Sequence, residues 1–329
     1  AIHGLLLYIV MQDGAPKEEK AAKTEETVAE EEPPAPEEEA LPEALRPRPP
    51  LKLDWSRAVK GNVAALPGSK AVRAGILVDL DSGEVLWAKN ENQPVPIASM
   101  SKIMTILLAY EAALDPKNDV MLDTKIPVTR EAIDVPPSKV GFYQGESFPL
   151  RDLLVASSIQ SANDASYLVA QHLGGGNADV FVRAMNQRAA ELGMENTTFF
   201  NPHGLPGRNR DFDNKSSMTD IVRLCWEFMR HEELMEWAAI RRAPFRKQGE
   251  KGYVMMRNHN NLLPGAKYQA EGVTGIKTGF TNRAGCCVAA SCLRDGRHLL
   301  AVIAGAPHAK DRDLFARDLF DWGYKRVKR

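Results

Sequence analysis

The sequence is poor in residues that mark several protein classes. Only four of its 329 residues are cysteine and none has a Cys-x-x-Cys spacing, which excludes a disulfide scaffold and favours buried free thiols. The seven histidines are scattered without ligand spacing, so we expect no metal and no other cofactor. An apolar run at 5–11 falls short of the roughly 20 residues that cross a bilayer.

Charge of one sign is also scarce, because 42 basic residues balance 43 acidic ones for a formal net charge of −1. The balance hides an asymmetry. Residues 13–45 hold twelve carboxylates and only three lysines, which leaves a net charge of +8 on residues 46–329. That basic body has no dense Lys/Arg run with interleaved aromatics, so we expect no nucleic-acid partner.

The N-terminal part of the chain predicts no packed core. Residues 13–50 carry eight of the 21 prolines and few large apolar side chains, so burial cannot offset their ordering entropy, and we expect a disordered acidic linker. Residues 1–12 are typical of a trimmed signal peptide or N-terminal anchor, with a loose apolar start as the alternative. The remainder, 51–329, is long enough for one large domain or two interlocked subdomains.

Beyond residue 70 the hydrophobic period indicates strands, then helices, then strands. A turn at 81–83 joins two apolar strands into a hairpin, and the run from Val273 predicts further strands. Between them, a helix from about 97 to Asp115 has almost no polar face and should be buried. The other segments with a helical pattern are 149–159, 164–173, 180–192, 217–230 and 311–323.

This order of elements predicts a mixed α/β fold of the α+β type. Strands at both ends imply an antiparallel sheet assembled from distant segments and flanked by helices. We expect a sheet lobe of about 51–100 and 237–329, with an inserted helical lobe of about 101–236. The cleft between two such lobes is the natural place for a functional site.

Ser99 and Lys102 open the buried helix and are the first candidates for chemistry. Three residues apart, they project from one helix face, and the helix N-terminus places backbone N–H groups beside the serine. A lysine inside an apolar helix is poorly solvated, which lowers its pKa and makes a neutral amine available as a general base. The alternative is a surface lysine beside a serine that caps the helix.

Two further triplets carry polar groups that suit a reactive site. Ser161-Ala162-Asn163 lies at the break between two helices, where a hydroxyl could relay a proton. Capping of the following helix by Ser161, Asn163 or Asp164 is the simpler explanation. Lys277-Thr278-Gly279 ends the first late strand, where a cation, a hydroxyl and a bare backbone suit an anion. A strand running into a turn is the alternative there.

Taken together, the triplets Ser-x-x-Lys, Ser-x-Asn and Lys-Thr-Gly resemble the set found in serine β-lactamases and penicillin-binding proteins. The chain resembles one branch closely, the D-alanyl-D-alanine carboxypeptidase family, from about Lys70 to Tyr324. The stretches that carry this resemblance are PIASMSKIMT (96–105), GESFPLRDLLVASSIQSANDAS (145–166), FVRAMNQRAAELGMENTTFFNPHGL (181–205), RNHNNLL (257–263) and GIKTGFTNRAG (275–285). The resemblance implies a β-lactamase/DD-peptidase-like fold.

The resemblance also implies a role for each residue. Ser99 would be the acylated nucleophile and Lys102 its general base, while Ser161 would pass the proton to the leaving amine. Asn163 would hold the lysine and the substrate amide, and Lys277, Thr278 and Gly279 would receive the substrate carboxylate. The backbone N–H groups of Ser99 and Phe280 would form the oxyanion hole. Arg312 would be a further contact for the carboxylate. A solvated arginine at the start of the last helix is an equal alternative for Arg312.

The implied activity is removal of the terminal D-alanine from peptidoglycan stem peptides, with penicillins as covalent inhibitors, in the bacterial cell envelope outside the cytoplasm. Cys286 and Cys287 depart from the aliphatic pair usual in the family. The chain stops at Arg329 without the family's C-terminal anchor, so any membrane tether would come through the N-terminus. The alternatives are a DD-endopeptidase, a β-lactamase or esterase, and a non-catalytic wall-binding protein. The β-lactamase lacks support because no Glu-x-x-Leu-Asn segment occurs.

Overall fold

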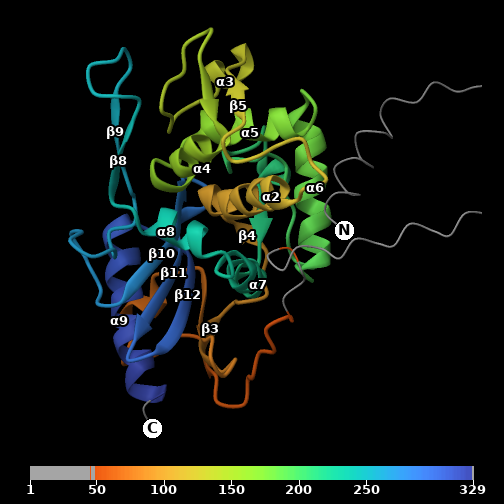
Figure 1. Cartoon of the computed structure of the whole chain (residues 1–329). Coiled ribbons are helices and arrows are strands. Elements are labelled where there is room, and N and C mark those ends of the chain that lie inside the picture. Colours follow the sequence, from red (N-terminus) through yellow and green to blue (C-terminus); the bar gives the residue numbers. More distant parts are fainter. Residues whose placement is uncertain (1–44, 46–48, 328–329) are drawn as a thin grey trace, which may run out of the picture.

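The computed structural model describes residue 45 and residues 49–327. Its centre is a six-stranded sheet of strand order β1-β3-β2-β12-β11-β10, and it joins segments from both ends of the sequence (Figure 1). Five of its strands pair antiparallel, whereas the short edge strand β1 runs parallel to β3. The predicted α+β fold is therefore confirmed, with one parallel pair added. The strands of this sheet are β1 (Val59–Lys60), β2 (Ala74–Asp79), β3 (Val85–Lys89), β10 (Val273–Thr281), β11 (Gly285–Arg294) and β12 (Arg297–Ala306).

The sheet is covered on both faces, which explains why its central strands are apolar throughout. Along β2, Ile76 and Val78 belong to one hydrophobic cluster and Leu77 to a second one. The long C-terminal helix α9 (Ala309–Val327) packs on the second face through Phe315 and Phe320. Since successive strand residues point to opposite faces, burial on both sides removes the polar alternation of a half-exposed strand.

Several helices pack around one buried helix, as the sequence predicts. Almost every residue of this helix, α2 (Lys102–Leu114), is buried, and Asp115 is its C-cap. Its start differs from the expectation, because residues 98–101 form a separate 3₁₀ turn and the α-helix begins only at Lys102. The remaining helices and 3₁₀ turns are η2 (Pro67–Lys70), η3 (Ala98–Ser101), α2 (Lys102–Leu114), α3 (Arg130–Asp134), α4 (Leu150–Ile159), α5 (Asn163–Leu173), α6 (Ala178–Glu191), η4 (Arg210–Phe212), α7 (Met218–Phe228) and α8 (Glu232–Ala239).

Three small two-stranded sheets lie outside the central sheet in the described part of the chain. They pair β4 (Val95–Pro96) with β7 (Lys215–Ser216), β5 (Lys125–Pro127) with β6 (Ser147–Pro149), and β8 (Arg242–Phe245) with β9 (Val254–Arg257). The last pair forms a hairpin that projects from the molecule beside α4 (Figure 1). All four cysteines are free and buried, which confirms the expectation for the thiols.

The predicted N-terminal segments lie largely outside the described residues. This applies to 1–12 and to most of the linker predicted for 13–50. Leu45 is buried, and the backbone carbonyl of Pro49 accepts a hydrogen bond from Trp226 Nε1 at 3.1 Å. Among the helices of the described part, none combines the length and hydropathy needed to cross a membrane. The bounds expected for the two lobes stay a prediction.

Candidate active site

Ser99 lies on the 3₁₀ turn η3, immediately before α2. Its Oγ is 3.0 Å from Lys102 Nζ. In a 3₁₀ turn, residues i and i+3 lie above one another, so this conformation brings the serine and the lysine at least as close as an α-helix would. The pairing expected from their spacing therefore forms, although on a different kind of turn.

Lys102 has no solvent exposure at all. Its Nζ donates to Asn163 Oδ1 at 2.7 Å and to the backbone carbonyl of His203 at 2.6 Å. Burial lowers the pKa of Lys102 well below its usual value, and the nearby charge of Lys277 lowers it further. The alternative of a surface lysine is wrong. A neutral amine in hydrogen-bond contact with a serine hydroxyl is the arrangement that general-base activation requires.

Ser161 and Asn163 lie where α4 ends and α5 begins. The N-cap of α5 is Ala162, which makes no side-chain capping bond, so the explanation by capping through Ser161 or Asn163 is wrong. Instead, Asn163 bonds Lys102 through its oxygen and the backbone carbonyl of Pro136 through its nitrogen, at 3.0 Å. Ser161 has a φ of 57°, a rare backbone conformation for a residue with a side chain. Such outliers concentrate at functional sites.

The triplet 277–279 lies within the edge strand β10 rather than at its end, which corrects the expected position. Gly279 faces the turn that carries Ser99: a Cβ atom at this position would lie 2.8 Å from the Ile97 carbonyl oxygen and 3.0 Å from the Ser99 nitrogen. Only glycine permits this approach. The backbone of β10 thereby comes close to the backbone of Ser99, and Ser99 and Phe280 both line the cleft.

Two cations lie together beyond Thr278. Lys277 is buried, and burial together with the charge of Arg312 lowers its pKa to about 7. Arg312 is also buried, with 3% exposure, and its guanidinium contacts Asp313 Oδ1 at 2.6 Å. The alternative of a solvated helix-start arginine is therefore wrong. Asp313 receives a second bond from Asn261 Nδ2 at 3.0 Å, which fixes the carboxylate that orients Arg312.

These residues surround one cleft of about 620 Å³ between the helical part and β10. Seven of the nine residues expected at the site line it. They are Ser99, Ser161, Asn163, Thr278, Gly279, Phe280 and Arg312. Lys102 is fully buried and reaches the cleft through its bond to Ser99, and Lys277 is buried beside Thr278, whose carbonyl it contacts at 3.1 Å.

Sequence reasoning missed several groups around the cleft. The backbone carbonyl of His203 accepts from Lys102, and Gly204 adopts a φ of +83° against the Ala98 backbone. Burial, with the charge of Lys102, lowers the pKa of the His203 imidazole to about 3 and keeps that ring neutral. The segment 257–261 supplies four cleft residues. The motifs NPHGLP and RNHNNLL contain these positions, but a backbone carbonyl carries no residue-type signal.

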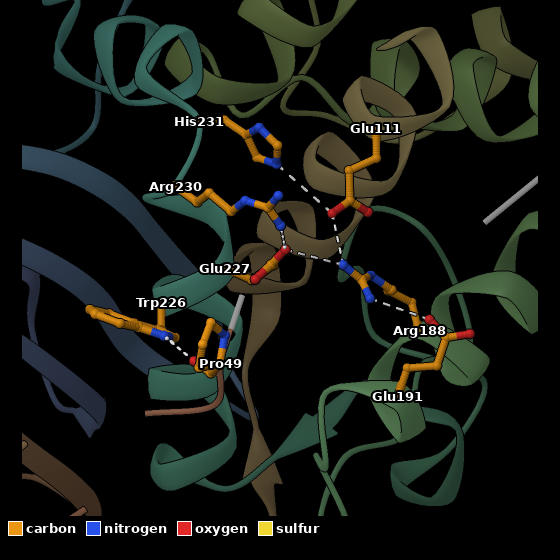
Figure 2. Close-up of polar contacts among 8 residues, drawn as sticks. All are labelled: Pro49, Glu111, Arg188, Glu191, Trp226, Glu227, Arg230 and His231. Atoms are coloured by element: carbon orange, nitrogen blue, oxygen red, sulfur yellow. Dashed lines mark hydrogen bonds and ion pairs between the residues drawn. The ribbon is translucent and has the colours of Figure 1, made fainter. Parts of the chain in front are cut away.

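A buried ionic cluster joins three helices at a place separate from the residues that line the cleft (Figure 2). Glu111, Glu227 and His231 offer possible metal ligands within 4.8 Å of one another. However, Arg188 Nη2 lies between them, 2.8 Å from Glu111 Oε1 and 3.4 Å from Glu227 Oε1. Because this guanidinium already supplies the positive charge, we interpret the cluster as an ionic anchor between α2, α6 and α7. The expected absence of a metal stays a prediction.

Comparison with known proteins adds sequence and structural relatives. The sequence model of the D-alanyl-D-alanine carboxypeptidase family matches residues 62–308. D-alanyl-D-alanine carboxypeptidase DacF of Bacillus subtilis is 32% identical over 78% of this chain and 63% of its own length. A D-alanyl-D-alanine endopeptidase of Pseudomonas aeruginosa is 30% identical over 68% of this chain and 69% of its own. The chain thus spans about two thirds of the length of these curated relatives.

A solved structure is similar across almost its whole length. It is penicillin-binding protein D2 of Listeria monocytogenes in its ampicillin-bound form, with a TM-score of 0.65 and 28% identity over 77% of this chain and 98% of that one. The same arrangement of sheet and helices therefore occurs in a protein that holds a β-lactam.

Proposed function

The chain belongs to the D-alanyl-D-alanine carboxypeptidase family, and from that premise we propose that it is a serine-type D-Ala-D-Ala carboxypeptidase. Its substrate is a peptidoglycan stem peptide, from which it removes the terminal D-alanine. The observation that carries this proposal is the contact between Ser99 Oγ and the buried Lys102 amine at 3.0 Å, at the edge of a cleft with a cationic end. A reactive hydroxyl, a desolvated base and a carboxylate receptor are what acyl transfer from such a peptide needs.

Acylation begins when the neutral Lys102 amine takes the proton from Ser99. The oxygen attacks the carbonyl between the last two D-alanines, and the backbone N–H groups of Ser99 and Phe280 receive the negative charge. Ser161 passes a proton to the nitrogen as the C–N bond breaks, so free D-alanine leaves. A positioned base contributes about 10²–10⁴ in rate. An oxyanion donor contributes about 3–4 kcal/mol.

The cationic end of the cleft selects a peptide with a free terminal carboxylate. Thr278 offers a hydroxyl at the cleft wall, and Lys277 and Arg312 offer charge. A bound carboxylate next to Lys277 favours its protonated form, which keeps the charge where the substrate needs it. Asn163 holds Lys102 through its Oδ1 atom and also lines the cleft, where its side chain can contact the substrate amide.

Water completes the reaction by hydrolysing the ester on Ser99, which gains the proton while the shortened peptide gains the hydroxyl. A β-lactam enters by the same attack, but its leaving nitrogen stays attached to the acyl group, so the adduct persists. We place the enzyme outside the cytoplasm in the bacterial cell envelope, at its peptidoglycan substrate. The +8 charge of residues 46–329 supports attraction to an anionic wall.

A DD-endopeptidase activity is the second candidate, since a relative of similar identity carries that name. The chemistry at Ser99 would be identical, and only the leaving group would be larger. No observation on the described residues favours a β-lactamase. A non-catalytic binder is disfavoured as well, because all three triplets are in place.

The decisive experiment is intact-mass measurement after benzylpenicillin treatment, together with D-alanine release from a pentapeptide. We expect one penicillin adduct on the native protein and none on Ser99→Ala, which also releases no D-alanine. The matched control is Ser101→Ala, because Ser101 lies on the same turn but its hydroxyl bonds the Ala98 carbonyl at 2.8 Å and Asn214 Nδ2 at 2.9 Å rather than Lys102. D-alanine release at the native rate by Ser99→Ala would sink the assignment.

A further inference from the structure

The β8–β9 hairpin places two arginines directly opposite each other. In its register Arg242 pairs with Arg257, and both residues are exposed. Residues opposite one another across a strand pair have Cβ atoms about 4.5–5.5 Å apart on one face, and like charges there are destabilising. Such a pair is at its most favourable when an anion lies between the two guanidinium groups.

No acid of the described chain supplies that anion. Within residue 45 and residues 49–327, neither guanidinium forms a hydrogen bond or an ion pair. By contrast, Arg246 on the same hairpin is held by Glu146 at 2.8 Å. The hairpin therefore carries one arginine with a structural partner and two that face solvent without one.

The hairpin is anchored firmly enough to hold these arginines in place. Arg246 binds both carboxylate oxygens of Glu146 at 2.8 Å and the Gly141 carbonyl at 2.7 Å. The Phe245 ring packs on Phe148 with centroids 4.8 Å apart. At the base, Arg257 N donates to the side-chain oxygen of Gln160 at 3.1 Å, next to Ser161. Preorganised groups bind with less loss of entropy than mobile ones.

Arg257 lines the cleft. The residues that follow Arg257 show which end of the cleft this segment contacts. Asn260 Nδ2 donates to the Gly275 carbonyl, two residues before Lys277. Asn261 donates to Asp313, the partner of Arg312. His259, between Arg257 and these anchors, is exposed to solvent as a residue, yet partial desolvation of its ring and the charges of Lys277 and Arg312 lower its pKa to about 4. The segment that begins with Arg257 is thus tied to the cationic end, which is the leaving-group side of the scissile bond in the proposed function.

A substrate that ends in D-alanine terminates at Lys277 and Thr278 and has no further anion to offer. A leaving group that reaches beyond them must belong to a second peptide. We propose that Arg242 and Arg257 form an anion subsite for a carboxylate of the second peptide in a cross-linked substrate, which rests on the proposed function and adds an endopeptidase substrate to it. The same bonds change as in the carboxypeptidase reaction: the D-alanyl C–N bond breaks, the amine of the second peptide takes a proton, and water hydrolyses the ester on Ser99.

The experiment compares three synthetic substrates. The first is a monomeric pentapeptide, and the second is a dimer of two stem peptides joined through a D-alanyl amide. The third is the same dimer with the carboxylates of its second peptide amidated, except for any carboxylate next to the scissile amide, which Lys277 and Thr278 receive in all three substrates. We expect the native protein to cleave the free-carboxylate dimer with a kcat/KM about tenfold above that of the amidated dimer. The double variant Arg242→Gln, Arg257→Gln should lose this preference.

The control is Lys247→Gln, which removes one positive charge from the exposed tip of the hairpin and should keep the preference. Because the two arginines repel each other, removing their charges should leave the hairpin folded, which circular dichroism checks. Equal rates on the two dimers for the native protein, or an undiminished preference in the double variant, would overturn the subsite. Cleavage of the pentapeptide with no cleavage of either dimer also overturns it but leaves the carboxypeptidase proposal standing. Failure on all three substrates without a penicillin adduct overturns both.

Discussion

Lys277 and Arg312 influence each other because two positive charges share one end of the cleft. Burial and Arg312 lower the pKa of Lys277 to about 7. Above that pH the free protein loses the lysine charge that receives the substrate carboxylate, so kcat/KM for a pentapeptide should fall on the alkaline side with a midpoint near 7. Arg312→Gln removes a like charge, which raises the pKa of Lys277 and moves this midpoint upward. The measurement is a pH profile of kcat/KM.

The control for this profile is Arg317→Gln, a half-buried arginine of the same helix that pairs with Asp318. It should leave the midpoint unchanged. A profile of Arg312→Gln with the native midpoint and only a lower plateau would contradict the coupling, because it would show that Arg312 binds substrate without affecting the charge of Lys277.

At the residue scale, the sequence predicts the groups that carry their chemistry in their side chains. Ser99, Lys102 and Asn163 meet in the cleft as their order and spacing suggest. The carbonyl of His203 contacts Lys102 just as closely but could not be predicted, since every residue has a carbonyl. Asp313 was equally hidden, because an acid that orients an arginine resembles any acid on a helix until the packing is known.

At the element scale, the site depends on how closely β10 approaches the turn of Ser99. A methyl group at residue 279 would meet the Ile97 carbonyl at 2.8 Å, so Gly279→Ala must push the strand from the turn. The two oxyanion donors, on Ser99 and Phe280, would then separate. A misplacement of about 1 Å costs about 100-fold in rate, and we expect a loss of that order in the rate of labelling by a fluorescent penicillin.

This loss should occur in a protein that remains folded, with a native far-ultraviolet circular dichroism spectrum. If Gly279→Ala reacts with penicillin at the native rate, the close approach of β10 does not position the oxyanion donors.

Long periodic elements were predictable, and short ones were not. The apolar pattern from Val273 gave β10, β11 and β12, and α2 was predicted as a buried helix. The hairpin β8–β9 was missed because Pro244 lies inside it, and proline argues against a strand. In a two-stranded hairpin, an exposed proline costs no hydrogen bond with a further strand. The five residues of α3 are too few to show a period at all.

At the scale of the whole molecule, the order of strands and helices predicts that segments far apart in the sequence build one sheet, and the structure confirms this for residues 59–89 and 273–306. The order of elements does not predict which buried charges connect the helices to one another. The buried cluster of Glu111, Arg188 and Glu227 joins three helices that lie far apart in the sequence. Sequence periodicity reports which face of a helix is apolar, but it does not identify the partner of a buried charge.

That cluster should control the stability of the whole helical part, including α2, which begins with Lys102. Arg188→Met leaves the buried Glu111 carboxylate without its closest partner, and removal of one member of a buried ion pair costs about 3–5 kcal/mol. We expect a loss of this size in the free energy of unfolding, measured by urea denaturation. Tryptophan fluorescence and penicillin labelling should be lost at the same urea concentration, because α2 contributes both to the core and to the site.

A double-mutant cycle separates this ionic effect from lost packing. Glu111→Gln in the Arg188→Met background removes the stranded charge, while Glu227 keeps Arg230 at 2.7 Å as a partner. The double variant should therefore be less destabilised than the sum of the two single variants. Strictly additive losses would show that Arg188 stabilises the helices through its volume alone, and the ionic connection between α2, α6 and α7 would then have to be abandoned.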